Sequence, residues 1–237
     1  MSLLDISGIE SGYGNLTILK KISIKIEAGE LVAIFGPNGS GKSTLAKTIF
    51  GELSTTNGLI KYKSTELNSK PAESRSSYGM GYVPQENNTF PLLTVEENLR
   101  VGLIRKDFKK VNEDIEIAYE MFPRLRERSN QLAKTLSGGE RKMLALASAI
   151  VIGSEFVLID EPTSGLAPIV VDSLIEKTLE IANSGVTILW IVGDDAIKIL
   201  PSADRRFLMR SGMIKGKWSI EDPIASKELA ELYFQEN

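Results

Sequence analysis

The chain has 237 residues, of which 42% are hydrophobic and 25% charged, and its formal net charge is −3. This composition fits one sizeable soluble domain, and the lack of a net basic charge argues against wrapping nucleic acid as its main task. Cysteine and histidine are both absent, which excludes disulfides, thiol chemistry, the usual zinc ligands and Ser-His-Asp triads. Catalysis must therefore rely on carboxylates, lysine, backbone dipoles and a hard metal such as Mg²⁺.

The first third of the chain predicts short strands around one glycine-rich loop. Alternating apolar residues predict a half-exposed strand at 22–26, and a continuous apolar run predicts a fully buried strand at 31–35. A helix is expected from Lys42 to about Phe50, and further strands at 58–63 and 80–84. Residues 63–77, rich in Ser, Lys and Glu, predict a loose surface connection.

From about residue 94 to 152 the pattern is helical, and Thr94 with Glu97 fits a capping box. Strand and helix then alternate: strands are expected at 156–159 and 186–192, and helices near 168–183 and 195–200. A hairpin is expected at Ser211-Gly212, and the last dozen residues are expected to be helical. Buried strands that alternate with helices predict an α/β fold with a mostly parallel sheet, and the helical stretch is an inserted lobe.

No segment has the pattern of a signal peptide or of a membrane span. The longest apolar runs, 144–153 and 186–193, fall well short of the ~20 residues that a span needs. We therefore expect a soluble protein that contacts a membrane only through a partner.

The glycine-rich loop satisfies the pattern GxxxxGK[ST] between a predicted buried strand and a predicted helix. The segment reads Gly36-Pro37-Asn38-Gly39-Ser40-Gly41-Lys42-Ser43-Thr44. Glycines allow the backbone N–H groups to surround phosphate oxygens, and the helix adds its positive dipole end. Lys42 would reach the β- and γ-phosphates, and the Ser43 hydroxyl would bind Mg²⁺. A chance glycine-rich turn is the alternative, and the flanking strand and helix disfavour it.

A second motif consists of four apolar residues, 156–159, followed by Asp160 and Glu161. Such a strand would deliver Asp160 beside the phosphate loop, where it could hold Mg²⁺ directly or through water. Glu161 could then orient or deprotonate an attacking water. A strand that ends in acids at the surface is a common alternative, but the pairing with the phosphate loop favours a catalytic role.

A third motif, residues 136–140, reads LSGGE. Ser137 as N-cap and Glu140 three residues later predict a capping box at a helix start. The two successive glycines, Gly138 and Gly139, leave the first N–H groups of that helix bare, which also predicts an anion site.

Residues 36–44, Gln85, 136–140 and 156–161, in this order, resemble the motifs of the ATP-binding subunits of ABC transporters. The resemblance covers essentially the whole chain. It implies a P-loop NTPase core with a mostly parallel sheet, a small antiparallel β subdomain and an inserted α-helical subdomain. It further implies one ABC ATPase domain over 1–237, with a core at about 1–85 and 155–220, a helical insert at about 88–153 and a C-terminal helix at about 224–237.

The same resemblance implies roles for single residues. In that family two chains sandwich two ATP molecules head to tail, so the signature of one chain acts on ATP held by the other; the signature residues here are Ser137, Gly138, Gly139 and Glu140. Gln85 matches a glutamine that senses Mg²⁺ and the attacking water, in a neighbourhood that faces the membrane partner. The expected metal ligands are Ser43, Gln85 and Asp160. Tyr13 stands where an aromatic residue stacks on adenine, or it is an ordinary surface tyrosine.

Residues 90–99, 121–125 and 165–168 resemble the ATPases of branched-chain amino-acid importers, which usually work as heterodimers. Asp194 departs from the pattern, because ABC ATPases generally place a histidine there, and this subgroup often a glutamine, in contact with the γ-phosphate. An ionised carboxylate near that phosphate is repelled. Ala167, where most relatives have aspartate, agrees with the subgroup. We therefore expect Glu161, Gln85, Lys42 and Asp194 to influence hydrolysis, and hydrolysis to be slow when the chain pairs with itself.

The expected ligands are ATP and Mg²⁺. The expected partners are a second ABC ATPase in a homo- or heterodimer, integral membrane permease subunits and, for an importer, a solute-binding protein, but no nucleic acid. The chain would then lie in the cytoplasm, on the inner face of the cell membrane. A nucleotide-dependent regulatory or assembly scaffold with weak hydrolysis is the alternative. A DNA-maintenance ATPase is rejected, because the stretch between Lys42 and Asp160 contains no long coiled coil.

Overall fold

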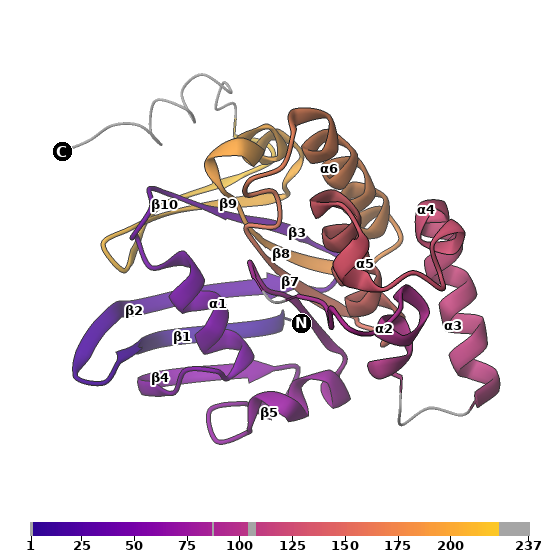
Figure 1. Ribbon diagram of the computed structural model, residues 1–237. Coiled ribbons are helices and arrows are strands. Elements are labelled where there is room, and N and C mark those ends of the chain that lie inside the picture. Colours follow the sequence, from indigo (N-terminus) through magenta and orange to yellow (C-terminus); the bar gives the residue numbers. More distant parts are fainter. Residues whose placement is uncertain (1, 87, 104–107, 223–237) are drawn as a thin grey trace.

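The computed structural model describes residues 2–86, 88–103 and 108–222, which form two β-sheets and a group of helices (Figure 1). The C-terminal helix expected at about 224–237 lies outside the described residues.

The larger sheet has six strands and is mostly parallel. Its strands are β3 (Leu31–Phe35), β6 (Met80–Val83), β7 (Phe156–Asp160), β8 (Thr187–Ile191), β9 (Arg205–Arg210) and β10 (Met213–Ser219). They are ordered β10-β9-β3-β8-β7-β6, and β10, which pairs with β9, is the antiparallel one. The parallel arrangement that the apolar runs predict is thus confirmed.

The central strands are buried on both faces, and alternate residues enter two different cores. In β3, Val32 and Ile34 join the core beneath the second sheet and helix α1 (Lys42–Phe50), whereas Leu31, Ala33 and Phe35 join the core beneath the other helices. Strands β7 and β8 alternate in the same way. This period of two explains why these strands are continuously apolar.

The smaller sheet is antiparallel, with the order β2-β1-β4-β5. It contains β1 (Ser2–Tyr13), β2 (Leu16–Glu27), β4 (Thr55–Tyr62) and β5 (Thr65–Glu66). Strand β1 is absent from the strands expected above, because register shifts in its pairing break the alternation of apolar residues, one of them between Ile6 and Ile9, where Gly8 has a φ of 60°.

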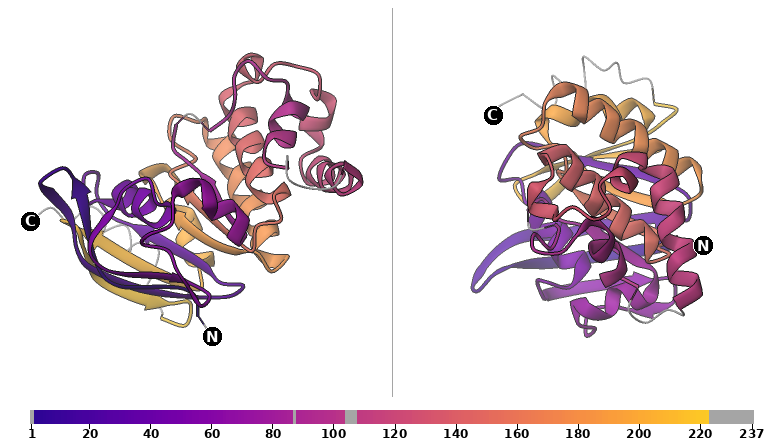
Figure 2. Two further views of the ribbon diagram at one scale, coloured as in Figure 1. Left: turned by 90° about the horizontal axis from the view of Figure 1, so that it is seen from below. Right: turned by 45° about the vertical axis from the view of Figure 1, so that its right-hand side comes forward.

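Among the described residues, four α-helices lie between β6 and β7 in the chain. They are α2 (Val95–Val101), α3 (Phe108–Met121), α4 (Pro123–Glu127) and α5 (Gly138–Val151), with a short 3₁₀ helix η2 (Ala133–Thr135) before α5. They stand to one side of the two sheets, as the left view of Figure 2 shows. Helix α6 (Pro168–Asn183) occurs where a helix was expected, with Pro168 in its first turn. Helix α6 contacts α5 and the 3₁₀ helix η3 (Asp194–Ser202).

Two expectations from local composition are wrong. The stretch 63–77 is not a loose connection: it contains β5 and most of the 3₁₀ helix η1 (Ala72–Tyr78). Within η1, Arg75 is buried and donates hydrogen bonds to the carbonyls of Ile49 and Leu67. The stretch near 195–200 forms the 3₁₀ helix η3 rather than an α-helix, with Pro201 inside it.

Both expected capping boxes are present. Thr94 caps α2 together with Glu97, and Ser137 caps α5 together with Glu140. Within the described ranges, none of the helices combines the length and the apolar character needed to cross a lipid bilayer.

Candidate functional site

The phosphate loop joins the end of β3 to the start of α1, and its backbone requires glycine. Gly36, Gly39 and Gly41 have φ angles of 149°, 76° and 101°. A Cβ atom on Gly36 would lie 2.0 Å from the carbonyl oxygen of Met209, so no other residue fits there. Gly41 is the N-cap of α1 and has no side chain to offer the first N–H groups of the helix. The positive end of α1 therefore stays open to an anion.

Lys42 is a buried cation at this helix start, with only 4% of its surface exposed. Its Nζ donates a hydrogen bond to the carbonyl oxygen of Gly36 at 2.8 Å and forms an ion pair with Glu161 Oε1 at 3.1 Å. The ammonium group is thus held at the loop by one carbonyl and one carboxylate.

Ser43 and Asp160 meet beside the loop. The Ser43 hydroxyl donates to Asp160 Oδ1 at 3.2 Å, although the two residues come from α1 and the end of β7. Burial and, to a lesser degree, the nearby Glu161 raise the pKa of Asp160 to about 6, although the Ser43 hydrogen bond, Lys42 and Lys47 oppose this. A buried carboxylate that is costly to ionise gains most from a cation bound next to it.

Glu161 follows directly in a strained conformation. Its φ is 41°, which is uncommon for a residue with a long side chain, and its N–H donates to the carbonyl of Ile191 at 3.0 Å. Gln85 Nε2 donates to Glu161 Oε2 at 3.2 Å. One carboxylate oxygen therefore faces Lys42 and the other faces Gln85, because β6 and β7 are neighbours in the sheet.

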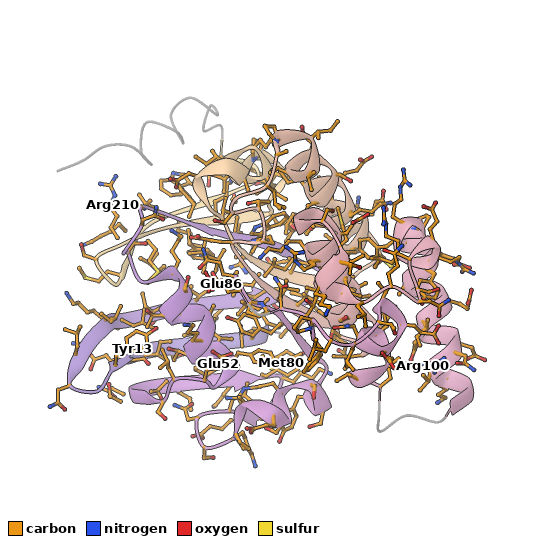
Figure 3. The ribbon with its side chains drawn as sticks, in the orientation of Figure 1. Tyr13, Glu52, Met80, Glu86, Arg100 and Arg210 are labelled. Atoms are coloured by element: carbon orange, nitrogen blue, oxygen red, sulfur yellow. The ribbon has the colours of Figure 1, made fainter. Side chains whose placement is uncertain are left out.

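The residues present fit a phosphate group and Mg²⁺. Ser40 Oγ is buried and has no hydrogen-bond partner among the described residues. Buried hydroxyl groups are normally hydrogen-bonded, so a bound phosphate would supply the partner that is lacking here. A cavity of about 350 Å³ lies where Ser43, Asp160 and Gln85 come together, and its other lining residues are Lys47, Glu52, Tyr82, Pro84 and Glu86. Figure 3 shows Glu86 near the centre of the molecule, with Arg100 on the helical side and Tyr13 on the side of the antiparallel sheet.

The oxygen atoms of Ser43, Asp160 and Gln85 are of the kind that Mg²⁺ prefers. The described residues contain no group of three or more His, Cys, Asp or Glu side chains that could hold a metal alone. Mg²⁺ at this place would therefore take its remaining ligands from phosphate and water, as is usual for this ion.

Tyr13 is the last residue of β1, and 48% of its surface is exposed. Nearly half of this residue is therefore accessible to a ligand. Its assignment as an adenine-stacking residue stays a prediction.

The signature residues are not among those gathered around Lys42. Ser137 is exposed at the start of α5; its N–H donates to Glu140 Oε2 at 2.8 Å, and its hydroxyl oxygen accepts from the Glu140 N–H at 3.3 Å. Burial opposes ionisation of Glu140, but hydrogen bonds from Ser137 and the positive charges of Arg128 and Arg124 lower its pKa overall; Arg128 forms an ion pair with Glu140 at 2.7 Å. A rigid, ionised capping box thus presents Gly138 and Ser137 at the surface.

Asp194 is the first residue of η3 and its side chain is exposed. It lies three residues beyond β8, whose last residue, Ile191, accepts the hydrogen bond from Glu161. Ala167 is the N-cap of α6 and gives that helix no side-chain cap.

The sequence reasoning missed three residues that shape this site. The N–H of Gly212 donates to the carbonyl of Ser40 at 2.9 Å, and Met209 contacts Gly36 and Gly41, so the β9–β10 hairpin supports the phosphate loop. Lys142 of α5 donates to the carbonyl of Gln85. Burial lowers the pKa of Lys142, while Glu86 and Asp160 oppose this. The Ser-Gly turn in the sequence predicts the hairpin, but nothing in the sequence predicts its contact with the phosphate loop or the role of Lys142.

Comparisons with known proteins agree with these features. The sequence model of the family described as "ABC transporter" matches residues 19–164. The chain is 35% identical to the high-affinity branched-chain amino acid transport ATP-binding protein BraG of Pseudomonas aeruginosa, over 90% of this chain and 91% of the relative. It is 30% identical to the lipopolysaccharide export system ATP-binding protein LptB of Haemophilus influenzae, over 100% and 98%. A crystal structure of a nucleotide-free ATP-binding cassette from an ABC transporter superimposes with a TM-score of 0.83 at 26% identity, and all of both chains is covered.

Proposed function

The chain belongs to the ABC transporter family and is an ATP-binding, ATP-hydrolysing subunit, and we propose that it drives the import of branched-chain amino acids through separate membrane subunits. The import direction and the solute class are supported by the 35% identity to BraG and by the resemblance of residues 90–99, 121–125 and 165–168 to that subgroup. LptB, which serves export, is less similar at 30%.

The observation that carries the catalytic part is the position of Glu161 between Lys42 and Gln85, next to the Ser43–Asp160 pair. In our proposal Lys42 turns from Gly36 and Glu161 towards the oxygens of the β- and γ-phosphates, where its charge opposes the charge that develops during transfer. Glu161, released from Lys42, then accepts a proton from the attacking water. Gln85 orients that water and Glu161 by its amide group.

Mg²⁺ bound by Ser43 and Asp160, with Gln85 close by, would neutralise charge on the phosphate oxygens. Asp160 must be ionised for this task, and its raised pKa makes ion binding weaker as the pH falls below about 6. The exposed ring of Tyr13 would stack on the adenine, a contact worth about 1 kcal/mol.

The second half of the site is proposed to come from another chain, either a copy of this one or a sister ATPase. The hydroxyl oxygen of Ser137 already accepts the N–H of Glu140, so its own O–H remains able to donate. Together with the N–H groups of Gly138 and Gly139 it would contact the γ-phosphate bound by the opposing chain. Closure of two such chains on ATP would move the helical side of each, and hydrolysis would reset them.

A groove of about 380 Å³ fits the membrane partner. It lies between the large sheet and the helical side, and its apolar lining includes Phe50, Met80, Val101, Ala149 and Ile152. Tyr82 and Pro84, which precede Gln85, also line it. We assign this groove to a short apolar helix of the permease, because movement there would reach Gln85 directly. The chain would then be held on the inner face of the membrane, and a solute-binding protein would deliver the amino acid outside.

Calorimetry of the purified chain with Mg·ATP tests the nucleotide site, and reconstitution with the co-purified permease tests the transport role. We expect saturable ATP binding, and uptake of leucine, isoleucine or valine that stops with Glu161→Gln. Lack of ATP binding would refute the whole proposal, whereas ATP-driven export or transport of another solute would refute only the substrate part.

A nucleotide-dependent scaffold with weak hydrolysis is a second candidate, and Asp194 favours it, because a carboxylate replaces the usual histidine or glutamine. The intact Glu161 favours the enzyme. Turnover in the presence of the permease separates the two, since a scaffold would bind ATP and the partner without multiple turnovers.

A further inference from the structure

Helix α5 packs unusually close to strand β6. A Cβ atom on Gly81 would lie 2.8 Å from the backbone oxygen of Ala149 and from the Ser154 hydroxyl, so glycine is required for this contact. Lys142 precedes Ala149 by seven residues, which is about two helical turns, and therefore lies on the same face of α5. Gln85 lies four residues beyond Gly81. The helix contact at Gly81 thus sets the distance at which Lys142 meets Gln85.

Lys142 uses this position to hold the backbone of the catalytic segment. Its Nζ donates to the carbonyl oxygen of Gln85, in a partly buried setting that strengthens a charge-assisted hydrogen bond. The neighbouring Arg141 points elsewhere, because its guanidinium donates to the carbonyl of Leu136. The charged groups that act on Lys142 are Glu86 and Asp160, which favour its charged form, and Arg141, which opposes it.

The contacts continue from Gln85 to the phosphate loop. The Gln85 amide donates to Glu161, and Glu161 pairs with Lys42. One uninterrupted series of contacts therefore joins four residues: Lys142 of α5, Gln85 after β6, Glu161 after β7 and Lys42 at the start of α1. Gln85 takes part through its backbone carbonyl on one side and its side-chain amide on the other. The series begins on α5, whose N-terminus carries Ser137, and ends on α1, whose N-terminus would hold phosphate.

We propose that Lys142 is a positioning residue, which fixes Gln85 against Glu161 and so transmits the placement of the signature helix to the catalytic carboxylate of the same chain. This inference rests on the proposed function and adds to it a residue that touches neither nucleotide nor metal. An exposed lysine that merely solubilises the helix surface would have no such effect.

The test compares Lys142→Met and Lys142→Arg with the control Lys134→Met in the full-length chain. Lys134 is an exposed lysine of η2 on the same helical side, so its replacement removes the same charge without touching Gln85. Three quantities are measured: amide hydrogen exchange of peptides that cover Gln85, the Kd for Mg·ATP, and kcat with KM for hydrolysis. Thermal unfolding is recorded for every variant.

For Lys142→Met we expect faster exchange around Gln85 and a kcat reduced roughly 10- to 100-fold, with Kd and KM for ATP changed less than about twofold. Lys142→Arg keeps a cationic donor and should restore the exchange rate and most of the turnover. Lys134→Met should behave as wild type.

Unchanged exchange at Gln85 in Lys142→Met overturns the proposal, and so does an equal effect of Lys134→Met. A parallel loss of ATP affinity, turnover and thermal stability, without rescue by arginine, would indicate a merely structural role and also overturns it. If the wild-type chain fails to bind Mg·ATP, the proposed function fails instead, and the exchange of the nucleotide-free chain still decides whether Lys142 holds Gln85.

Discussion

The N-termini of α1 and α5 are both expected to contact phosphate, but they are capped in different ways. At α1 the cap is Gly41, which has no side chain, and the adjacent Lys42 is buried against Gly36 and Glu161. At α5 the cap is Ser137, which is exposed and locked in a capping box with Glu140. The N-terminus of α1 is therefore held by other groups of the same chain, whereas the N-terminus of α5 is fixed by its own capping box at the surface.

The difference shows what each end needs from its surroundings. A bare helix start stays stable without an anion only if other groups of the same chain hold the loop, and Lys42, Glu161 and the hairpin at Gly212 do so. A helix start that meets its ligand from outside must keep its shape alone, and the capping box supplies that. Four changes test this contrast, beginning with the largest effect.

Glu161→Gln should separate binding from chemistry at the α1 end. Glutamine keeps the size of the side chain and can still face Lys42 and Gln85, but it cannot accept a proton from water. We expect kcat to fall by roughly 10²- to 10⁴-fold, with ATP affinity nearly unchanged, as measured by turnover and calorimetry. Retained turnover would show that the base is another group.

Ser137→Ala should lower both stability and turnover, and the matched variant Thr94→Ala separates these two effects. Loss of the cap costs about 1 kcal/mol of unfolding free energy, and loss of the donor towards the opposing phosphate lowers turnover by roughly 10²- to 10³-fold. Thr94→Ala removes an equivalent capping box from α2 and should cost similar stability without that loss of turnover. Equal turnover in the two variants would contradict a role of Ser137 beyond capping.

Asp160→Asn should make the nucleotide-free protein more stable. Replacing the capping residue of α5 should have the opposite effect on stability. Because the pKa of Asp160 is raised in the folded state, its protonated form stabilises the fold; this stabilisation is complete below about pH 3.8 and is lost as the pH rises to about 6. Asparagine imitates the protonated form at every pH. We expect a gain on the order of 2–3 kcal/mol at pH 7.5 and almost none at pH 4 by denaturant unfolding.

The same substitution should abolish the additional stabilisation by Mg²⁺ in the presence of ATP, because the carboxylate is lost. If Mg²⁺ added together with ATP still raises the melting temperature of the Asp160→Asn variant, the metal is bound by groups other than Asp160.

Asp194→His should give the smallest effect, since this side chain is exposed at the start of η3, three residues beyond the end of β8. Removal of one negative charge near the γ-phosphate is worth about 1 kcal/mol in a solvated setting, or a factor of about 5 in kcat. Asp194→Ala should give part of this gain. Identical turnover of both variants and the wild type would show that Asp194 has no effect on chemistry.

The elements that were predictable are those with a strong local pattern. The phosphate loop lies between a buried strand and a helix, and both capping boxes follow from residues three positions apart. Helix α6 matches the helix expected near 168–183, and its buried residues recur at helical spacing after Pro168. The pairing of Ser43 with Asp160 could be expected once two motifs were assigned to one site.

What escaped prediction depends on contacts between distant parts of the chain. Bulges hide the alternation in β1, and burial of Arg75 under α1 cannot be inferred from the polar composition of 63–77. Lys142 has no motif of its own, because its role follows from the close approach of α5 to Gly81. The positive φ of Glu161 likewise arises from its place at the end of β7 and has no local signal.

The support of the phosphate loop by the β9–β10 hairpin has a consequence for how the protein is made. Met209 and Gly212, which lie against Gly36 and Ser40, are synthesised long after the loop itself. A nascent chain stalled before residue 209 would hold the complete GPNGSGKS segment without the groups that shape it. The phosphate loop would therefore take its final shape only after the β9–β10 hairpin has been made.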